Sequence, residues 1–263
     1  MEAATGAGGG SAAAVSAGDD PLAPPMEACT CAGSFVVRDG LPPVTIWRDV
    51  ADRLDTGCVG GGVWSASPVL IRYLAALDKD WRGQRVMELG AGSGTVGLAL
   101  ARLGAHVTLT DLPAMVHVLR VNVERNFPAG AAPDPSAAAV TCRAQRWGEP
   151  LGGGPYDVVV GADIVYMDGS FDPLVRTMVD AAQQGAVVIF AYAPQRGEAP
   201  SFWDEEPSSR FMQAAEEHFD VDVLGADIMP PPEDKEIAPF GCDTPIWIYE
   251  FKLRSGAASK AAA

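Results

Sequence analysis

A glycine-rich turn between a short apolar segment and an amphipathic segment is the clearest site of chemistry in the sequence. The run Val86–Gly97 places Gly90, Gly92 and Gly94 at alternating positions, between a predicted strand and a predicted helix. Glycines let the backbone turn tightly and approach a ligand closely, beside the positive end of the following helix. Gly92, Gly94 and Gly97 also fit the spacing of a dinucleotide-binding fingerprint, so the turn alone predicts a ligand site without naming the ligand.

The acidic residue Glu88, two positions before the first glycine, favours one class of ligand over the other. A carboxylate at that point would repel a pyrophosphate, whereas it suits a ligand that carries an ammonium and a sulfonium group. S-adenosylmethionine carries both groups. The turn is therefore predicted to bind S-adenosylmethionine rather than a nicotinamide dinucleotide.

A second acidic residue, Asp111, directly follows the predicted strand His106–Thr110 and lies 21 residues past Gly90. At this point in such folds an acidic side chain can accept hydrogen bonds from both ribose hydroxyls. The alternative is that Asp111 only caps the next helix. Its place relative to the glycine turn favours ribose binding.

Two later strand ends deliver further candidate side chains. Trp147 follows the predicted strand Val140–Gln145 and could form an aromatic wall beside an adenine, or simply pack on the core. The predicted strand Asp157–Ala162 ends at Asp163, with Tyr166 three residues later. The binding crevice of an open α/β sheet lies outside the carboxyl ends of its strands, so both side chains are expected at the site. From the residues alone, Asp163 as a turn cap and Tyr166 as a core residue remain open.

Taken together, these blocks resemble the seven-β-strand protein-lysine N-methyltransferases, whose hallmark is a D-x-x-Y motif, here Asp163 to Tyr166. The similarity spans roughly Val44 to Leu253. Four blocks match in order: Gly62–Ser67, Glu88–Gly94 with Asp111, Trp147-Gly148, and Gly161–Tyr166. The resemblance and the residue chemistry together give the candidate cofactor-binding residues Trp64, Glu88, Gly90, Ala91, Gly92, Gly94, Asp111, Trp147 and Ala162. Asp163 and Tyr166 are the candidate catalytic residues, which the resemblance places beside the channel for the substrate lysine.

The function expected from this resemblance is in-line transfer of a methyl group from S-adenosylmethionine to the neutral amine of a lysine in a partner protein. Family resemblance suggests a chaperone, an ATPase or a translation factor as that partner. Alignment of the reacting atoms in a dry site would supply most of the acceleration. The alternatives are a methyltransferase that acts on a small molecule or on RNA, and a non-catalytic binding module that keeps the cofactor fold.

Alternating strand and helix patterns predict one α/β domain that positions these residues. The expected fold is Rossmann-like: seven mostly parallel strands with helices on both faces, a C-terminal antiparallel hairpin and a short N-terminal β extension. Strands are also predicted at Arg85–Leu89, Ala186–Tyr192, Phe219–Leu224 and Ile246–Leu253, and helices at Ser67–Leu77, Thr95–Leu103, Pro113–Asn126, Asp172–Gln183 and Pro207–His218.

The acidic, proline-rich stretch Met229–Pro239 is predicted to be a loop at the substrate rim, together with the N-terminal hairpin. Residues 1–33, 128–139 and 255–263 are predicted to be disordered or loop-like because they are rich in alanine, glycine and proline. The methyltransferase domain is thus expected over residues 34–254.

The composition limits the partners. The formal net charge of −15 argues against nucleic acid, since phosphate binding draws on clustered Lys and Arg. No apolar run reaches the roughly 18 residues that a membrane helix requires. The five cysteines show no zinc-site spacing, so no metal is expected, and free thiols point to the cytoplasm, with the nucleus as a further location. A monomer is the default expectation.

Overall fold

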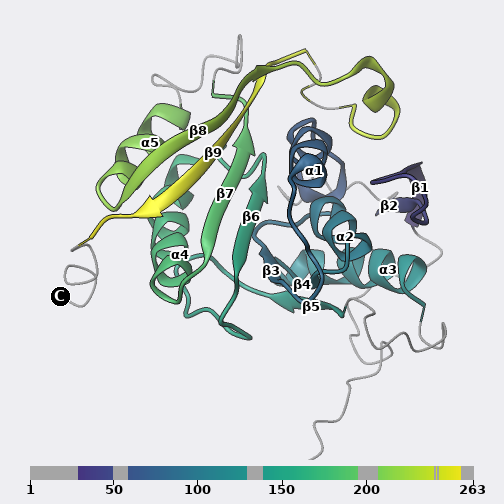
Figure 1. Ribbon diagram of the computed structural model, residues 1–263, viewed down its shortest axis with the longest axis horizontal. Coiled ribbons are helices and arrows are strands. Elements are labelled where there is room, and N and C mark those ends of the chain that lie inside the picture. Colours follow the sequence, from purple (N-terminus) through teal and green to yellow (C-terminus); the bar gives the residue numbers. More distant parts are fainter. Residues whose placement is uncertain are drawn as a thin grey trace, which may run out of the picture.

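A seven-stranded sheet forms the centre of the computed structural model, which describes residues 29–49, 59–128, 139–194, 207–239, 241 and 243–255 (Figure 1). The strand order is β5-β4-β3-β6-β7-β9-β8, and the strands from β5 to β7 are parallel. The strands are β3 (Arg85–Glu88), β4 (His106–Asp111), β5 (Val140–Ala144), β6 (Val158–Ala162), β7 (Val187–Tyr192), β8 (Phe219–Ile228) and β9 (Ile246–Leu253). The predicted fold class and the count of seven strands are confirmed.

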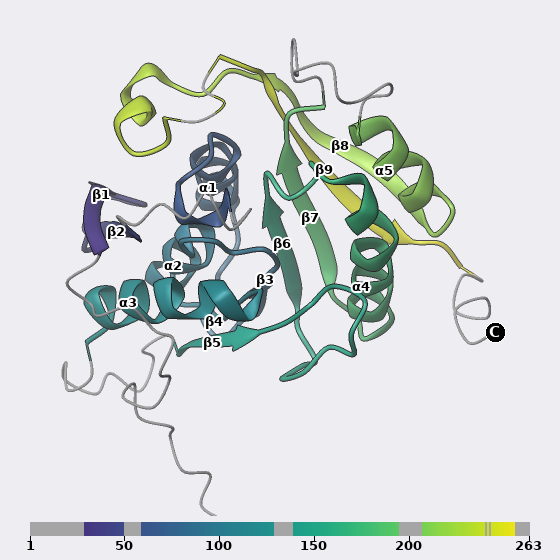
Figure 2. The same ribbon diagram turned by 180° about the vertical axis from the view of Figure 1, so that it is seen from behind.

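Helices cover both faces of this sheet, as Figures 1 and 2 show from opposite sides. One face carries α1 (Ala66–Ala76), α2 (Thr95–Arg102) and α3 (Val116–Asn126), and the other carries α4 (Phe171–Gln183) and α5 (Pro207–Glu216). Strand residues alternate between the two faces, so Val86 packs in the core under α1–α3 and Met87 in the core under α4 and α5. The sheet therefore lies between two hydrophobic clusters.

The chain reverses direction at the end of the sheet. Strand β9 runs antiparallel to both β7 and β8, which completes the predicted C-terminal hairpin. Strand β8 is longer than predicted, because it continues past Leu224 to Ile228 through two irregularities of register near Gly225. The connection that follows, predicted to be a loop, contains the short 3₁₀ helix η6 (Pro232–Glu236).

A separate antiparallel hairpin, made of β1 (Cys29–Phe35) and β2 (Val44–Asp49), packs beside α3. Two asparagines of α3 bind alternate residues of β2 through both their amide and carbonyl groups. Asn126 accepts the Thr45 N–H and donates to the Thr45 carbonyl (2.9 and 2.7 Å), and Asn122 does the same with Trp47 (2.7 and 2.8 Å). The helix thereby provides hydrogen-bond partners for the backbone N–H and C=O groups of Thr45 and Trp47 on the edge of β2 that faces away from β1.

Strand β1 begins at Cys29, so its pairing with β2 extends into the stretch 1–33 that the sequence predicted to be a disordered tail ahead of the domain. The strand that pairs with residues 29–33 is β2, which is distant in sequence, so the composition of these residues could not reveal that they form a strand. The predictions for residues 1–28, 129–138 and 256–263 lie outside the described residues.

Candidate active site

The carboxyl ends of β3, β4, β5 and β6 open onto one cavity of about 550 Å³, which we call the strand-end cavity. Its walls include Trp64, Glu88, Gly90, Ala91, Gly92, Asp111, Trp147, Ala162, Asp163 and Tyr166. Ten of the eleven residues that the sequence predicted for the site therefore lie around one space. The volume falls within the range of about 300–1,000 Å³ that is usual for small-molecule sites.

The exception is Gly94, which is not among the residues that line the cavity. It caps the start of α2 with a left-handed backbone, and a Cβ built on it would lie 2.9 Å from the Leu109 side chain. Gly94 thus faces the core. It is needed for the turn into the helix and does not contact the cavity.

Two other glycines of the turn are required by close contacts. Gly90 and Gly92 have φ angles of +58° and +55°, in the left-handed region that favours glycine. A Cβ on Gly90 would lie 2.7 Å from the Ile164 side chain, and one on Gly92 would lie 2.6 Å from the carbonyl oxygen of Gly60. The turn can therefore sit against its neighbours only without side chains, and its backbone remains accessible from the cavity.

The carboxylate of Asp111 holds this turn in place. Its Oδ2 accepts the N–H of Gly92 at 2.7 Å, and its Oδ1 accepts the N–H of Leu112 at 2.7 Å. Burial raises the pKa of Asp111 above its ordinary value, while the two backbone N–H groups oppose the shift. Each oxygen has a second lone pair, so the carboxylate can still accept hydrogen bonds from a ligand in the cavity.

Glu88 is 3% exposed and points its Oε2 at the start of α2, where it accepts the Gly97 N–H at 2.7 Å. Burial raises the pKa of Glu88 to about 8 from its ordinary 4.5, and the backbone N–H groups of Gly97 and Val96 partly offset this effect. The carboxyl group therefore ties β3 to α2 besides lining the cavity. This bond is a structural role that the sequence did not suggest. The raised pKa favours the uncharged acid near neutral pH, so the predicted attraction to a cationic ligand requires the charge of that ligand to lower the pKa again.

Asp163 occupies the sharp turn at the end of β6, with a φ of +55° and 7% exposure. Its backbone N–H donates to Ala191 of β7 (2.9 Å), and its side-chain Oδ2 accepts the N–H of Ala66 at 3.0 Å. Ala66 is the first residue of α1 and lies 97 residues away in sequence. Asp163 is thus a cap of α1 supplied from a distant strand, beside Trp64 and the cavity.

The aromatic residues form parts of the cavity wall. Trp147 lies against the glycine turn, since a Cβ on Gly90 would be 3.2 Å from its ring. The backbone next to Trp147 is fixed by a hydrogen bond from the Gly148 N–H to Thr177 Oγ1 (2.7 Å). Trp64, Trp147 and Tyr166 are each half-buried, so each ring keeps surface available to a ligand.

Further residues line the cavity, from loops and from the first turns of α1 and α4. Gly62, Ser67, Ser93 and Ile164 stand in the blocks that carried the resemblance but were not named as site residues. The others were missed, because their approach depends on tertiary packing: Gly60, Leu112, Met115, Gln145, Arg146, Met167, Gly169, Ser170 and Pro173. For Gly60, the glycine run 60–62 ahead of Trp64 was the available signal, since Gly92 lies against Gly60.

A segment of the predicted substrate rim is bound to α1 near the cavity. The carboxylate of Asp234 in η6 makes a two-pronged ion pair with the Arg72 guanidinium, and Glu233 lies 3.7 Å from the same group. Ser65 Oγ donates to the Gly241 carbonyl at 2.8 Å. Residues 229–239 are therefore attached to the helix that Asp163 caps.

Comparisons with known proteins agree with this geometry. A family model described as lysine methyltransferase matches residues 44–218. The chain is 39% identical over 138 residues to the zebrafish (Danio rerio) protein N-lysine methyltransferase METTL21A, a match that covers 51% of this chain and 60% of that protein. It is 38% identical over 137 residues to mouse (Mus musculus) EEF1A lysine methyltransferase 3, covering 51% of this chain and 55% of that protein. The chain thus spans somewhat more than half the length of these relatives.

Solved structures resemble the fold at low sequence identity. The magnesium protoporphyrin IX methyltransferase of Synechocystis, solved with bound S-adenosylhomocysteine, has a TM-score of 0.50 and 19% identity, and the match covers 72% of this chain and 82% of that one. An enzyme structure concerned with conversion of a disulfide bond into a thioacetal group in echinomycin biosynthesis has a TM-score of 0.51 and 18% identity, covering 81% and 95%. The family match spans most of the described sheet and its strand-end cavity: the chain belongs to the lysine methyltransferase family.

Proposed function

We propose that this chain is an S-adenosylmethionine-dependent protein-lysine N-methyltransferase. The observation that carries the proposal is the arrangement around one cavity of the glycine turn, the Asp111 carboxylate and the Asp163–Tyr166 block. A cofactor side and an acceptor side thus share one space, which transfer between two bound molecules requires.

The residues of the cavity fit the cofactor. Asp111 has two oxygens with lone pairs to spare, which suits the two neighbouring hydroxyls of a ribose. Leu112 and Met115, immediately after β4, supply apolar surface for a flat base, and Gly90 and Gly92 leave room for close backbone approach. When bound, S-adenosylmethionine supplies the methyl group, carried on a cationic sulfur that leaves as a neutral thioether.

The acceptor side is assigned to Asp163, Tyr166 and Trp64. A lysine amine must be neutral to act as a nucleophile, and its ordinary pKa is about 10.4. The capped start of α1 keeps Trp64 and the Asp163 carboxylate in fixed positions beside the cavity, so that the amine is oriented by rigid groups. The ring of Tyr166 offers a face that stabilises the positive charge that the nitrogen gains as it accepts the methyl group.

The substrate is assigned to a partner protein that carries the target lysine. Residues 229–239 and the β1–β2 hairpin form the rim that would meet it, since Ile237 of this segment lies against Gly33 of β1. The mouse relative is named for a translation factor, and we include that class with chaperones and ATPases as candidates. No helix in the described parts of the chain is long and apolar enough to cross a membrane. On the scattered cysteines we propose the cytoplasm, with the nucleus as a further location, and a monomer as the default state.

The test is transfer of isotopically labelled methyl groups from S-adenosylmethionine into hypomethylated cell extract. Wild type, Tyr166→Phe and Tyr166→Ala are compared, with Tyr73→Phe as a control because Tyr73 is on α1 and does not line the cavity. We expect a discrete protein band that contains methyl-lysine, weakened by Tyr166→Ala and unchanged by Tyr73→Phe. Cofactor binding by calorimetry without any labelled protein would refute the protein substrate and favour a small-molecule acceptor.

A further inference from the structure

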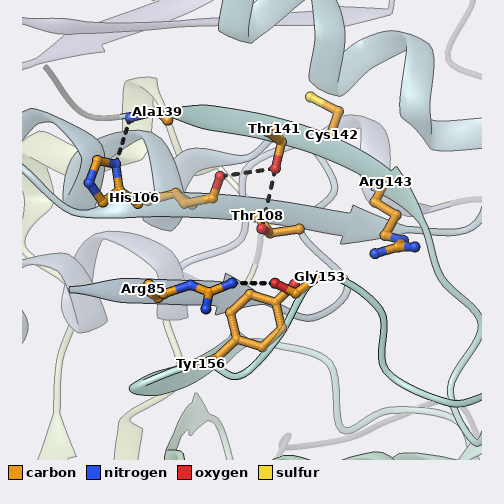
Figure 3. Close-up of a pocket in the computed structure, with 10 residues that line it drawn as sticks. Arg85, His106, Thr108, Ala139, Thr141, Cys142, Arg143, Gly153 and Tyr156 are labelled. Atoms are coloured by element: carbon orange, nitrogen blue, oxygen red, sulfur yellow. Dashed lines mark hydrogen bonds between the residues drawn. The ribbon is translucent and has the colours of Figure 1, made fainter. Parts of the chain in front are cut away.

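A second cavity, of about 500 Å³, lies on the α4–α5 face of the sheet over β3, β4 and β5, and we call it the sheet-face cavity (Figure 3). It shares no lining residue with the strand-end cavity. It exists because the chain passes from β5 to β6 through residues 145–157 without a helix, whereas α4 and α5 lie over the other end of the sheet. This part of the face is therefore open.

The residue types of β3, β4 and β5 fit a face that is not covered by a helix here. Strand residues that point to the α1–α3 face are apolar, including Val86, Val107 and Leu109. Their neighbours on the opposite face line the cavity and are polar: Arg85, His106, Thr108, Thr141 and Arg143. Parallel strands covered on both faces are normally apolar throughout, so the polar row marks a surface that meets water or a ligand.

The two arginines converge on one loop, as Figure 3 shows. The Arg85 guanidinium donates to the Gly153 carbonyl, and a side chain on Gly152 would overlap the guanidinium of Arg143. The described residues that line the cavity include no carboxylate. The carboxylate of Asp157 binds the backbone N–H of Arg85 (2.7 Å) and makes no ion pair with either guanidinium. Among the residues that the structure describes, the two guanidinium groups thus meet the same loop without a carboxylate partner, in a chain whose net charge is −15.

Hydroxyl and imidazole groups extend this set of donors. Thr141 Oγ1 lies 3.4 Å from the Val107 carbonyl oxygen and 3.2 Å from Thr108 Oγ1, and its single proton can bond to either, so the two hydroxyls together form a donor pair beside the cavity. His106 Nδ1 accepts the Ala139 N–H at 3.1 Å, so the ring carries its proton on Nε2. Guanidinium forks and hydroxyl donors around a concave space are the groups that bind phosphate oxygens.

We infer that the sheet-face cavity binds a phosphate-bearing small molecule, held between the guanidinium groups of Arg85 and Arg143. An extended peptide is the less suitable occupant of this face, because the backbone groups of β3 and β4 are paired on both sides and only the outer edge of β5, directed away from the cavity floor, is unpaired. The space is large enough for a ligand of nucleotide size. The inference does not depend on the proposed methyl transfer.

The probe is inorganic pyrophosphate, titrated by calorimetry into the full chain at constant ionic strength, with S-adenosylhomocysteine present to fill the strand-end cavity. We expect saturable binding of one equivalent. Arg143→Ala should weaken it at least tenfold, because the change removes one of the two guanidinium groups that hold the phosphate. The fold should be kept, because the Arg143 side chain is exposed. Thr108→Val should weaken it severalfold. The control is Arg120→Ala, which removes an exposed arginine from α3 on the opposite face and should change the affinity less than twofold.

Two results would overturn the inference. In the first, pyrophosphate does not bind; if poly-L-glutamate then binds in an Arg143-dependent manner, the cavity is assigned to an acidic protein segment. In the second, Arg120→Ala weakens binding as much as Arg143→Ala does, which would make the effect one of general charge. Circular dichroism melting of each variant separates loss of binding from loss of fold.

Discussion

Replacement of Asp163 by alanine would remove the carboxylate that accepts a buried backbone N–H, that of Ala66 at the start of α1. Asp163 Oδ2 accepts this N–H at 3.0 Å, and the Asp163 side chain is 7% exposed, so water cannot readily take its place. The change thereby acts on the junction between β6 and α1, which forms one wall of the strand-end cavity.

The expected loss of stability has two parts. A hydrogen bond to a charged group contributes about 1.5–3 kcal/mol. The backbone of Asp163 has a φ of +55°, a conformation that aspartate and asparagine tolerate and that costs alanine about 1–2 kcal/mol. Asp163→Ala should therefore lower the free energy of unfolding by about 2.5–5 kcal/mol. Asp163→Asn keeps an acceptor and the backbone preference, so its loss should be only about 1 kcal/mol.

Urea denaturation, followed by circular dichroism, measures these differences, and labelled methyl transfer is measured on the same samples. Asp78→Ala, at an exposed residue just after α1, is the matched control and should be neutral. Equal stability of Asp163→Ala and wild type would refute the capping role. If Asp163→Asn is stable and turns over within tenfold of wild type, the residue acts by positioning. A stable Asp163→Asn that loses a hundredfold or more would instead show that its charge takes part in transfer.

Three further outcomes are expected. Gly92→Ala should weaken the binding of S-adenosylmethionine, measured by calorimetry, far more than Gly83→Ala. Both glycines have a positive φ, but only a Cβ on Gly92 would meet a neighbour, the carbonyl oxygen of Gly60. Equal effects of the two changes would show that backbone strain alone matters. Asp111→Ala should lower cofactor affinity at least tenfold and the free energy of unfolding by about 2–4 kcal/mol, because two backbone N–H groups lose their acceptor; unchanged urea midpoints would contradict this. Burial raises the pKa of Glu88 to about 8, so between pH 4.5 and 8 the folded chain holds a proton that the unfolded chain releases, and stability falls as pH rises through this window. Glu88→Gln should flatten the fall in thermal melting across that range, and parallel curves for the two proteins would rule out Glu88 as its source.

The sequence was most informative where chemistry and strand ends coincide. Gly90, Gly92, Asp111 and Asp163 each lie at the end of a strand or in the turn that follows it. Parallel strands bring their carboxyl ends to one edge of the sheet. Local patterns were therefore enough to place these residues around one cavity. The same logic gave the seven strands, because alternating apolar patterns record which faces are buried.

Other features depend on contacts between distant segments and left no local pattern. Arg72 meets Asp234 across 162 positions, and neither residue type signals a partner. Gly94 continues the alternating spacing of Gly90 and Gly92, yet a Cβ on Gly94 would point at Leu109 in the core and not at the cavity. The absence of a helix between β5 and β6 could be read from the sequence, but the cavity that results could not, because it depends on where α4 and α5 lie.

The paired asparagines of α3 have a consequence for association between molecules. A strand at the edge of a sheet presents unpaired backbone groups that can recruit a strand from another chain. Asn122 and Asn126 occupy those groups on Thr45 and Trp47 with carboxamides, which have the same donor and acceptor as a peptide bond. The outer edge of β2 is thereby closed to intermolecular β-pairing, and the hairpin remains attached to the domain without extending its sheet.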